Sequence, residues 1–448
     1  MWSAVCCLCC RRCWYNCRWL GVCGLWDLVR RENSETGNSS SSSSASSPRR
    51  RPYIQFARMA HALASAFARR APVASPSVGR HLLLRGAATV AYLQTAHPGD
   101  VASLATWLDA NPTAVPRCVL GKTEGNGCVN DFTRGYASHV VASALGQRGE
   151  DTSIIMSGGT EGVLTPHFLC FATDESAPPA ALTPPAERGP RLVMGVARTR
   201  VLAPHEIGRR AQVEATRDAV LAACNKAGLA PSECCFAQVK CPLLTPDRVR
   251  QSSEPCATED GYVSMGMSRG ASALGVALAT GEIEASDFAM ACDGVCVDLS
   301  YSSSVASASA GIELMHAEVF VLGNARGSSS PLRAAACVMR DALDTPSVAR
   351  MLTEDAGLSM AHGQLTADSR RRVRAVLAKA DPVASVRGQR TTMCSDSDLH
   401  ATRHARASVG GLLAGLIGDT RLYVSGGAEH QGPAGGGPCC VVYEAEPC

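Results

Sequence analysis

The sequence predicts an α/β protein built from three similar α/β domains, which are internal repeats arranged around a pseudo-threefold axis with one central active site. The 448 residues are 46% hydrophobic but only 5% aromatic, which suits close-packed α/β units rich in small residues. The stretch IIMSGGTEG at Ile154–Gly162 returns near the C-terminus as YVSGGAEH at Tyr423–His430. Each copy predicts a buried strand that runs into a glycine turn exposing one serine. A lysine, an arginine and a serine also follow one another in this order in each third of the body.

Residues 1–88 are predicted to be a disordered tail outside the fold. Seven of the 22 cysteines lie within Cys6–Cys23, where CxxC spacings lack the second pair of ligands that a zinc site needs. The serine run Ser39–Ser44 is typical of a linker. Residues 59–88 are rich in Arg, Ala and Ser and contain no Asp or Glu, a composition that predicts a mitochondrial or plastid transit peptide. The alternative is a generic extension, which would leave the protein in the cytoplasm.

The first repeat unit is predicted to span residues 89–190. Asp100 caps a helix that ends near Asn111, and a strand then leads to Lys122. The sequence GKT at residues 121–123 lacks the upstream glycine that a phosphate-binding loop requires. A helix beginning at Arg134 and the turn Ser157-Gly158 complete this unit.

The second unit, residues 191–330, repeats the order. A strand at residues 192–197 precedes a long helix, Glu206–Lys226, and the next strand ends at Lys240. A further helix is predicted to start at Arg269.

The serine of the second unit is harder to place than the other two. Ser307 is followed by Ala308 instead of glycine, and Ser309 and the run Ser302–Ser304 are alternatives. We expect Ser307 to be the serine of this unit.

The third unit is predicted to span residues 331–448. A helix at Ser369–Leu377 leads to Lys379, Arg406 starts another helix, and a strand at Leu422–Val424 ends at Ser425.

Three such units would bring three lysines, three arginines and three serines to one cleft. Burial and mutual repulsion should lower the pKa of at least one lysine, which could then act as the base for a serine nucleophile. The arginines and the turn N–H groups would hold oxygens that carry developing negative charge. The cleft therefore suits a small planar ligand with several carbonyl groups. A net charge of +3 without a basic patch argues against nucleic acid, and no apolar run reaches the ~18 residues of a membrane span.

Six stretches carry a resemblance to a known family: GKTEGNGCVNDFTRG (121–135), IMSGGTEG (155–162), QVKCPLLT (238–245), SRGASALGVALATGE (268–282), DSDLHATRHARASVGG (396–411) and YVSGGAEHQGPAGGGP (423–438). They closely resemble the cyanuric acid amidohydrolase/barbiturase family over about Thr89–Val442. The resemblance implies a ring-opening amidohydrolase, usually a homotetramer, that acts on a small planar cyclic imide. Members convert cyanuric acid to carboxybiuret or barbiturate to ureidomalonate, and cyanuric acid is the substrate favoured here. A non-catalytic binder of the same fold is the remaining alternative.

The resemblance also implies roles for individual residues. Ser307 would be the nucleophile and Lys240 its base, while Lys122 with Ser157 and Lys379 with Ser425 would form accessory dyads. The predicted substrate-binding residues are Arg134, Ser157, Gly158, Arg269, Ser307, Ala308, Arg406, Ser425 and Gly426.

The family further implies a structural Mg²⁺ or Ca²⁺ near the C-terminal glycine turn. All-oxygen ligands suit these cations and not zinc. The predicted ligands are Asp381, Ala428, Gln431, Gly432, Pro433 and Gly436. Asp381 stands where close relatives carry glutamate.

Overall fold

The computed structural model describes residues 87–446, except 126–129, 175–188 and 396–399. The predicted transit peptide and cysteine cluster lie outside this range. All of the described residues belong to one compact unit. Ala87 and Ala88, which the sequence assigned to the tail, already belong to the first strand.

Three four-stranded sheets repeat one topology, which confirms the predicted fold class. The first contains β1 (Ala87–Gln94), β2 (Ala114–Lys122), β3 (Ser153–Ser157) and β4 (His167–Asp174). The second contains β5 (Arg191–Arg198), β6 (Cys234–Pro242), β7 (Ala306–Gly311) and β8 (Glu318–Ala325). The third contains β9 (Leu332–Met339), β12 (Val373–Ala380), β15 (Tyr423–Gly426) and β16 (Gly437–Glu444). In each sheet the strands lie in the spatial order first, fourth, second, third. The second and third strands are parallel, so both end at the same edge of the sheet.

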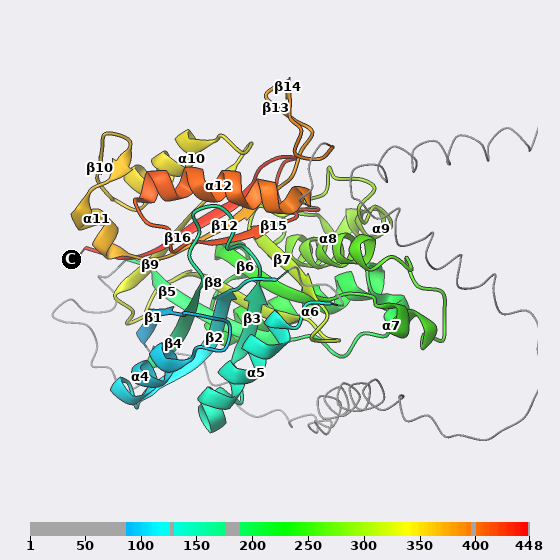
Figure 1. Ribbon diagram of the computed structural model, residues 1–448, viewed down its shortest axis with the longest axis horizontal. Helices are drawn as coiled ribbons and strands as arrows, with labels where there is room; N and C mark the ends of the chain where they lie inside the picture. The colour runs from blue at the N-terminus through cyan, green and yellow to red at the C-terminus, as the bar shows by residue number, and fades with distance from the viewer. Residues whose placement is uncertain (1–86, 126–129, 175–188, 396–399, 447–448) are drawn as a thin grey trace, which may run out of the picture. The chain divides into compact units, whose positions relative to one another are not determined.

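Helices cover the outer faces of the three sheets (Figure 1). The first sheet packs against α4 (Ala102–Ala110) and α5 (Thr133–Leu145), and the second against α6 (Arg210–Ala227) and α8 (Gly261–Thr280). The third packs against α12 (Ala401–Ile417). Apolar side chains from the opposite faces of all three sheets form one shared core, which includes Phe171, Phe320 and Tyr423. This core fixes the three sheets relative to one another.

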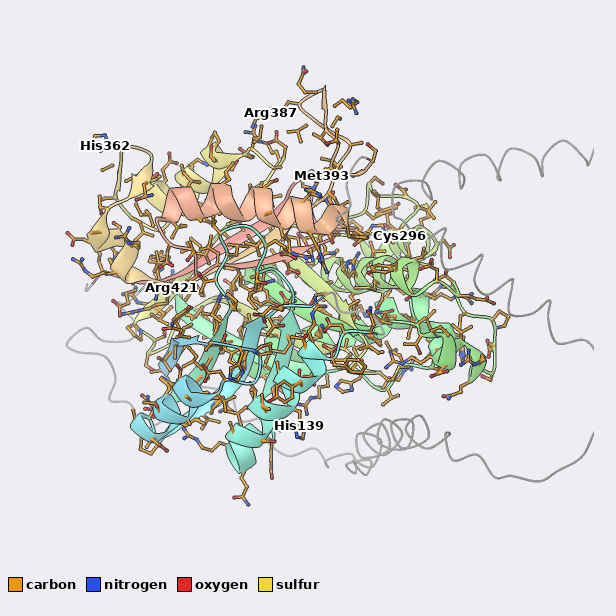
Figure 2. The ribbon with its side chains drawn as sticks, in the orientation of Figure 1. His139, Cys296, His362, Arg387, Met393 and Arg421 are labelled. Atoms are coloured by element: carbon orange, nitrogen blue, oxygen red, sulfur yellow. The ribbon has the colours of Figure 1, made fainter. Side chains whose placement is uncertain are left out.

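Shorter elements connect these layers. The short helices are α7 (Pro246–Arg250), α9 (Phe288–Asp293), α10 (Thr345–Arg350) and α11 (Ala367–Arg372), with 3₁₀ or π turns at Gly146–Gly149, Pro204–Glu206, Pro231–Glu233, Ala285–Asp287 and Met351–Asp355. Two hairpins pair β10 (Met360–Ala361) with β11 (Gln364–Leu365) and β13 (Ser385–Val386) with β14 (Gln389–Arg390). Their two-residue loops place His362 and Arg387 at positive φ, as tight hairpins require (Figure 2). No helix within the described part of the chain is long and apolar enough to cross a membrane.

The predicted helix at Ser369–Leu377 is wrong. The chain forms only the short α11 there and then enters β12, the central strand of the third sheet. Val376 and Leu377 are buried between β15 and β16, and this long-range pairing decides the conformation.

Two helix starts also differ from prediction. Asp260 caps α8 because its carboxylate accepts hydrogen bonds from the backbone N–H groups of Tyr262 and Val263. Arg269 therefore lies in the middle of that helix. In the same way α12 begins at Ala401, five residues before Arg406.

Candidate active site

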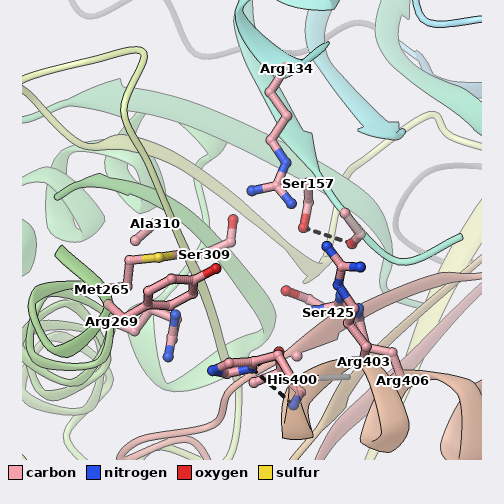
Figure 3. Close-up of a pocket in the computed structure, with 14 residues that line it drawn as sticks. Arg134, Ser157, Met265, Arg269, Ser309, Ala310, His400, Arg403, Arg406 and Ser425 are labelled. Atoms are coloured by element: carbon pink, nitrogen blue, oxygen red, sulfur yellow. Dashed lines mark hydrogen bonds between the residues drawn. The ribbon is translucent and has the colours of Figure 1, made fainter. Parts of the chain in front are cut away.

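A cavity of about 330 Å³ lies where the serine turns of the three units meet (Figure 3). Each unit contributes a serine, the residue after it and an arginine. The lining residues are Arg134, Ser157, Gly158, Tyr262, Met265, Arg269, Ser309, Ala310, His400, Thr402, Arg403, Arg406, Ser425 and Gly426. The structure therefore brings together seven of the nine predicted substrate-binding residues.

The three arginines reach the cavity from three different helices. Arg134 comes from α5, Arg269 from α8 and Arg406 from α12, and all three are buried apart from the atoms that face the cavity. Figure 3 shows their side chains approaching from separate directions. Three cations in so small a space favour a ligand with several oxygens that carry partial negative charge.

Ser307 and Ala308 do not line the cavity, contrary to the sequence prediction. In the parallel pairs β2–β3 and β12–β15, Lys122 lies opposite Ser157 and Lys379 lies opposite Ser425. The equivalent register in the second unit places Lys240 opposite Ser309, and Ser307 lies opposite Gln238.

The serine of the second unit is therefore Ser309, with Ala310 after it. Ser307 is on the same face of β7 but two residues further from the cavity, where it is fully buried. One sequence signal could have found this position. All three units share the pattern serine, small residue, glycine, any residue, glutamate, and in the second unit it begins at Ser309.

The lysines of the first and third units donate hydrogen bonds to their serines. Lys122 Nζ is 3.3 Å from Ser157 Oγ, and Lys379 Nζ is 3.3 Å from Ser425 Oγ. Lys122 Nζ also donates to Gly158 O at 2.6 Å, and Lys379 Nζ to Ala308 O at 2.5 Å. Two of the three predicted dyads are thus formed.

The lysine of the second unit is bound differently. Lys240 Nζ donates to Met156 O at 2.7 Å and lies 2.8 Å from Glu313 Oε1. Within the described residues, Ser309 Oγ has no hydrogen-bond partner. The Lys240–Ser309 pair therefore differs from the other two lysine–serine pairs, in which the lysine donates a hydrogen bond to the serine.

Burial is the main cause of the low pKa of all three lysines, since each ammonium lies in the protein interior. The pKa of Lys379 falls to about 7, and the charge of Arg269 contributes to this change. The pKa of Lys122 falls well below its ordinary value, with Arg406 adding to the effect of burial. Burial also lowers the pKa of Lys240, but the carboxylate of Glu313 opposes that shift. A lysine with a lowered pKa can take up a proton near neutral pH.

Sequence reasoning missed the glutamates that end each turn. Glu161 forms a two-point ion pair with Arg406, in which Nε lies 2.8 Å from Oε2. Glu429 does the same with Arg269, at 2.8 and 2.6 Å. Burial would raise the pKa of both carboxyl groups. The hydrogen bonds and charges of the arginines outweigh this effect and hold each pKa below that of a free glutamate. These pairs join different units and fix the arginines that face the cavity.

Sequence reasoning also missed residues at one side of the cavity. The rings of Tyr262 and His400 stack with centroids 5.3 Å apart, and both rings line the cavity. Arg403 adds a further cation there.

Two of the predicted metal ligands, Asp381 and Gln431, make hydrogen bonds at the C-terminal turn. Asp381 is a mostly buried carboxylate whose Oδ1 accepts from Ala428 N at 3.2 Å and whose Oδ2 accepts from Gly435 N at 2.9 Å. Gln431 Oε1 accepts from Ala308 N at 2.7 Å, which ties this turn to β7. One carboxylate, one amide oxygen and backbone carbonyls are the donor types that Mg²⁺ and Ca²⁺ take. Burial raises the pKa of Asp381, a cost that a bound cation would offset.

The repeated fold and this cavity agree with comparisons to known proteins. Residues 89–444 match the family described as amidohydrolase ring-opening protein, and the chain belongs to this family. It is 47% identical over 370 residues to a cyanuric acid amidohydrolase of Ectopseudomonas oleovorans, covering 79% of this chain and 98% of that protein. It is also 47% identical over 360 residues to the cyanuric acid amidohydrolase of Rhizobium johnstonii, covering 78% and 95%.

Two solved structures of cyanuric acid hydrolases share the fold. One superimposes with a TM-score of 0.73 at 44% identity, covering 80% of this chain and 99% of the other. The second, from A. caulinodans, gives a TM-score of 0.70 at 42% identity with the same coverage.

Proposed function

We propose that the protein hydrolyses cyanuric acid and opens its ring to give carboxybiuret. The observation that carries this proposal is the threefold set of groups around a small cavity. Each unit offers one serine hydroxyl, one turn N–H and one arginine. Cyanuric acid presents three equivalent carbonyl groups, so each unit would hold one of them. The names of the relatives support the same substrate.

The reaction assigned to the second unit begins with Ser309. Neutral Lys240 accepts the proton of the hydroxyl while Oγ bonds to a ring carbonyl carbon. The neighbouring ring C–N bond breaks, and the departing nitrogen takes the proton from the Lys240 ammonium. Water then attacks the resulting ester carbon and gives a proton to Lys240. The C–Oγ bond breaks, Oγ recovers the proton, and one water has been consumed per ring opened.

The contacts of the three serines support the choice of Ser309. Ser157 and Ser425 each accept a hydrogen bond from a lysine, whereas Ser309 Oγ has no partner within the described residues. Ser307 Oγ also lacks one, but Ser307 is not among the residues that line the cavity, and it lies opposite Gln238. Among these four serines, as far as the described residues show, Ser309 alone combines a hydroxyl without a partner, a position at the cavity and a lysine opposite.

The remaining groups bind and polarise the ring. The residue after each serine lines the cavity, and its N–H would hold an oxygen that becomes negative during attack. The arginines place positive charge around the same oxygens. Their fixed positions reduce the reorganisation that the reaction requires.

The full chain should be purified and given cyanuric acid and barbituric acid in separate assays, with ring opening followed by loss of ultraviolet absorbance and by mass spectrometry. Turnover of cyanuric acid to carboxybiuret, with barbiturate turned over at least about 100-fold less efficiently, is the expected result. Preferential turnover of barbiturate would overturn the substrate. If neither compound is turned over, the alternative of a non-catalytic binder with the same fold would remain.

We infer a divalent cation at the C-terminal turn, with Asp381 as its charged ligand. It would have a structural role, since none of its predicted ligands is among the residues that line the cavity. Elemental analysis after dialysis should find Mg²⁺ or Ca²⁺, and Asp381→Asn should reduce the bound amount and the melting temperature. Zinc, or equal metal content in both proteins, would contradict the assignment.

A further inference from the structure

The ion pairs between units follow a cycle that remains open at one place. Glu161 of the first unit pairs with Arg406 of the third, and Glu429 of the third pairs with Arg269 of the second. Continued once more, the pattern would pair Glu313 of the second unit with Arg134 of the first. In the structure, Glu313 contacts Lys240 instead.

The two residues that would close the cycle, Arg134 and Glu313, each have a buried polar atom without a hydrogen-bond partner in the described structure. Among the described residues, Arg134 Nε has no hydrogen-bond partner, and neither has Glu313 Oε2. In the described part of the chain, Arg134 makes a 3.6 Å ion pair with Asp131 and a 3.3 Å hydrogen bond to Gly125 O. Buried charged groups normally use all their polar atoms. The open pair is therefore unusual in this molecule, where the other two pairs are both two-point contacts.

Gly311 leaves room for the carboxylate of Glu313 next to the backbone. A Cβ added at Gly311 would lie 2.0 Å from Glu313 Oε2 and 2.6 Å from Lys240 Nζ. The absence of a side chain at this position allows carboxylate, ammonium and the Ser309 strand to lie side by side. The Glu313 side chain is only 11% exposed and Lys240 is fully buried, so water screens this pair little.

The two possible partners of Glu313 have different consequences for the reaction. A carboxylate beside Lys240 favours the ammonium, which cannot accept a proton from Ser309. Without that carboxylate, burial and the charge of Arg134 favour the neutral amine. The charged and titratable groups that act on Lys240 are Glu313, Arg134 and Cys241.

We propose that Glu313 is a positioning residue that exchanges partners, holding Lys240 in the free protein and Arg134 when substrate occupies the cavity. A ring oxygen bound by Arg134 would orient its guanidinium for the same two-point contact that the other two arginines make. Departure of the carboxylate would then leave Lys240 free to turn to Ser309 and release its ammonium proton to solvent water. Substrate binding would thereby create the base. This inference rests on the proposed function.

The test compares Glu313→Gln with wild type and with Glu161→Gln, a matched control that removes a carboxylate from the equivalent position of the first unit. The pH dependence of kcat/KM reports groups of the free enzyme, and that of kcat reports the substrate complex. In Glu313→Gln, the ascending limb of kcat/KM should move to lower pH by about one unit or more, because the carboxylate no longer favours the ammonium. The ascending limb of the pH profile of kcat should move by much less, since Glu313 has already left Lys240 in the substrate complex. Glu161→Gln should raise KM without moving either limb.

Three outcomes would overturn the inference. Equal shifts in both limbs would mean that Glu313 stays on Lys240 throughout, and no shift in either would leave it a purely structural residue. The third is a crystal structure of Ser309→Ala with cyanuric acid in which Glu313 still contacts Lys240. If Glu313→Gln folds poorly, the crystal structure of Ser309→Ala with cyanuric acid still tests the exchange, because it keeps Glu313 and shows whether the carboxylate contacts Arg134. Failure of wild-type protein to open either ring would count against the proposed function itself, whereas these outcomes leave it standing.

Discussion

Replacing the two candidate serines separately gives the sharpest test of the site. Ser309 lies opposite Lys240 at the cavity, whereas Ser307 lies opposite Gln238 and is fully buried. Ser309→Ala should lower kcat by roughly 10⁴–10⁶-fold, the loss seen when a serine hydrolase loses its nucleophile. This corresponds to about 5–8 kcal/mol of transition-state stabilisation. The variant should still bind cyanuric acid, because the arginines and the other two turns remain.

Ser307→Ala is the matched control, since it removes the same atom from the same face of the same strand. Its hydroxyl is buried without a partner in the described structure, so its removal relieves an unsatisfied polar group. We expect kcat to stay within about threefold of wild type and the free energy of unfolding to stay equal or rise by about 1 kcal/mol. Steady-state kinetics and chemical denaturation measure both quantities, and calorimetry measures ligand binding. Loss of turnover in Ser307→Ala together with near-normal turnover in Ser309→Ala would refute the assignment of the nucleophile.

Other perturbations have equally definite expectations. Lys379 has a folded-state pKa of about 7 because it is buried, so the unfolded chain binds more protons than the folded one above that pH. Stability should therefore rise with pH from about 7 toward 10, and Lys379→Met should flatten part of this rise in denaturant titrations. Arg269→Lys should raise KM at least about 10-fold, since lysine cannot make the two-point contact with Glu429; an unchanged KM would argue against its role in binding. Deleting residues 1–79 should leave turnover unchanged, because the family match begins at residue 89; an inactive truncated protein would contradict this.

Much of the architecture could be predicted from local sequence. The turns after Ser157 and Ser425 are marked by a short apolar run followed by two glycines, and both patterns depend only on neighbouring residues. The three lysines at strand ends and the three arginines on helices were likewise visible as a repeated order. Because the units are copies of one fold, repetition in the sequence implied repetition in space, and the three identical sheet topologies agree with it.

Other features depended on contacts between distant segments. The stretch Ser369–Leu377 has residues that suit a helix, yet pairing with β15 and β16 makes most of it a strand. Ser307 and Ser309 both point to one face of β7, so only its register against β6 decides which of them meets Lys240. The partner of each turn glutamate lies in another unit, and no local pattern reveals it. The sequence by itself determined that lysines, arginines and serines would recur in three units, because side-chain periodicity is local. Only the tertiary structure decided which carboxylate faces Lys240 and which arginine pairs with Glu161 and Glu429, because packing between units is set by residues far apart in the chain.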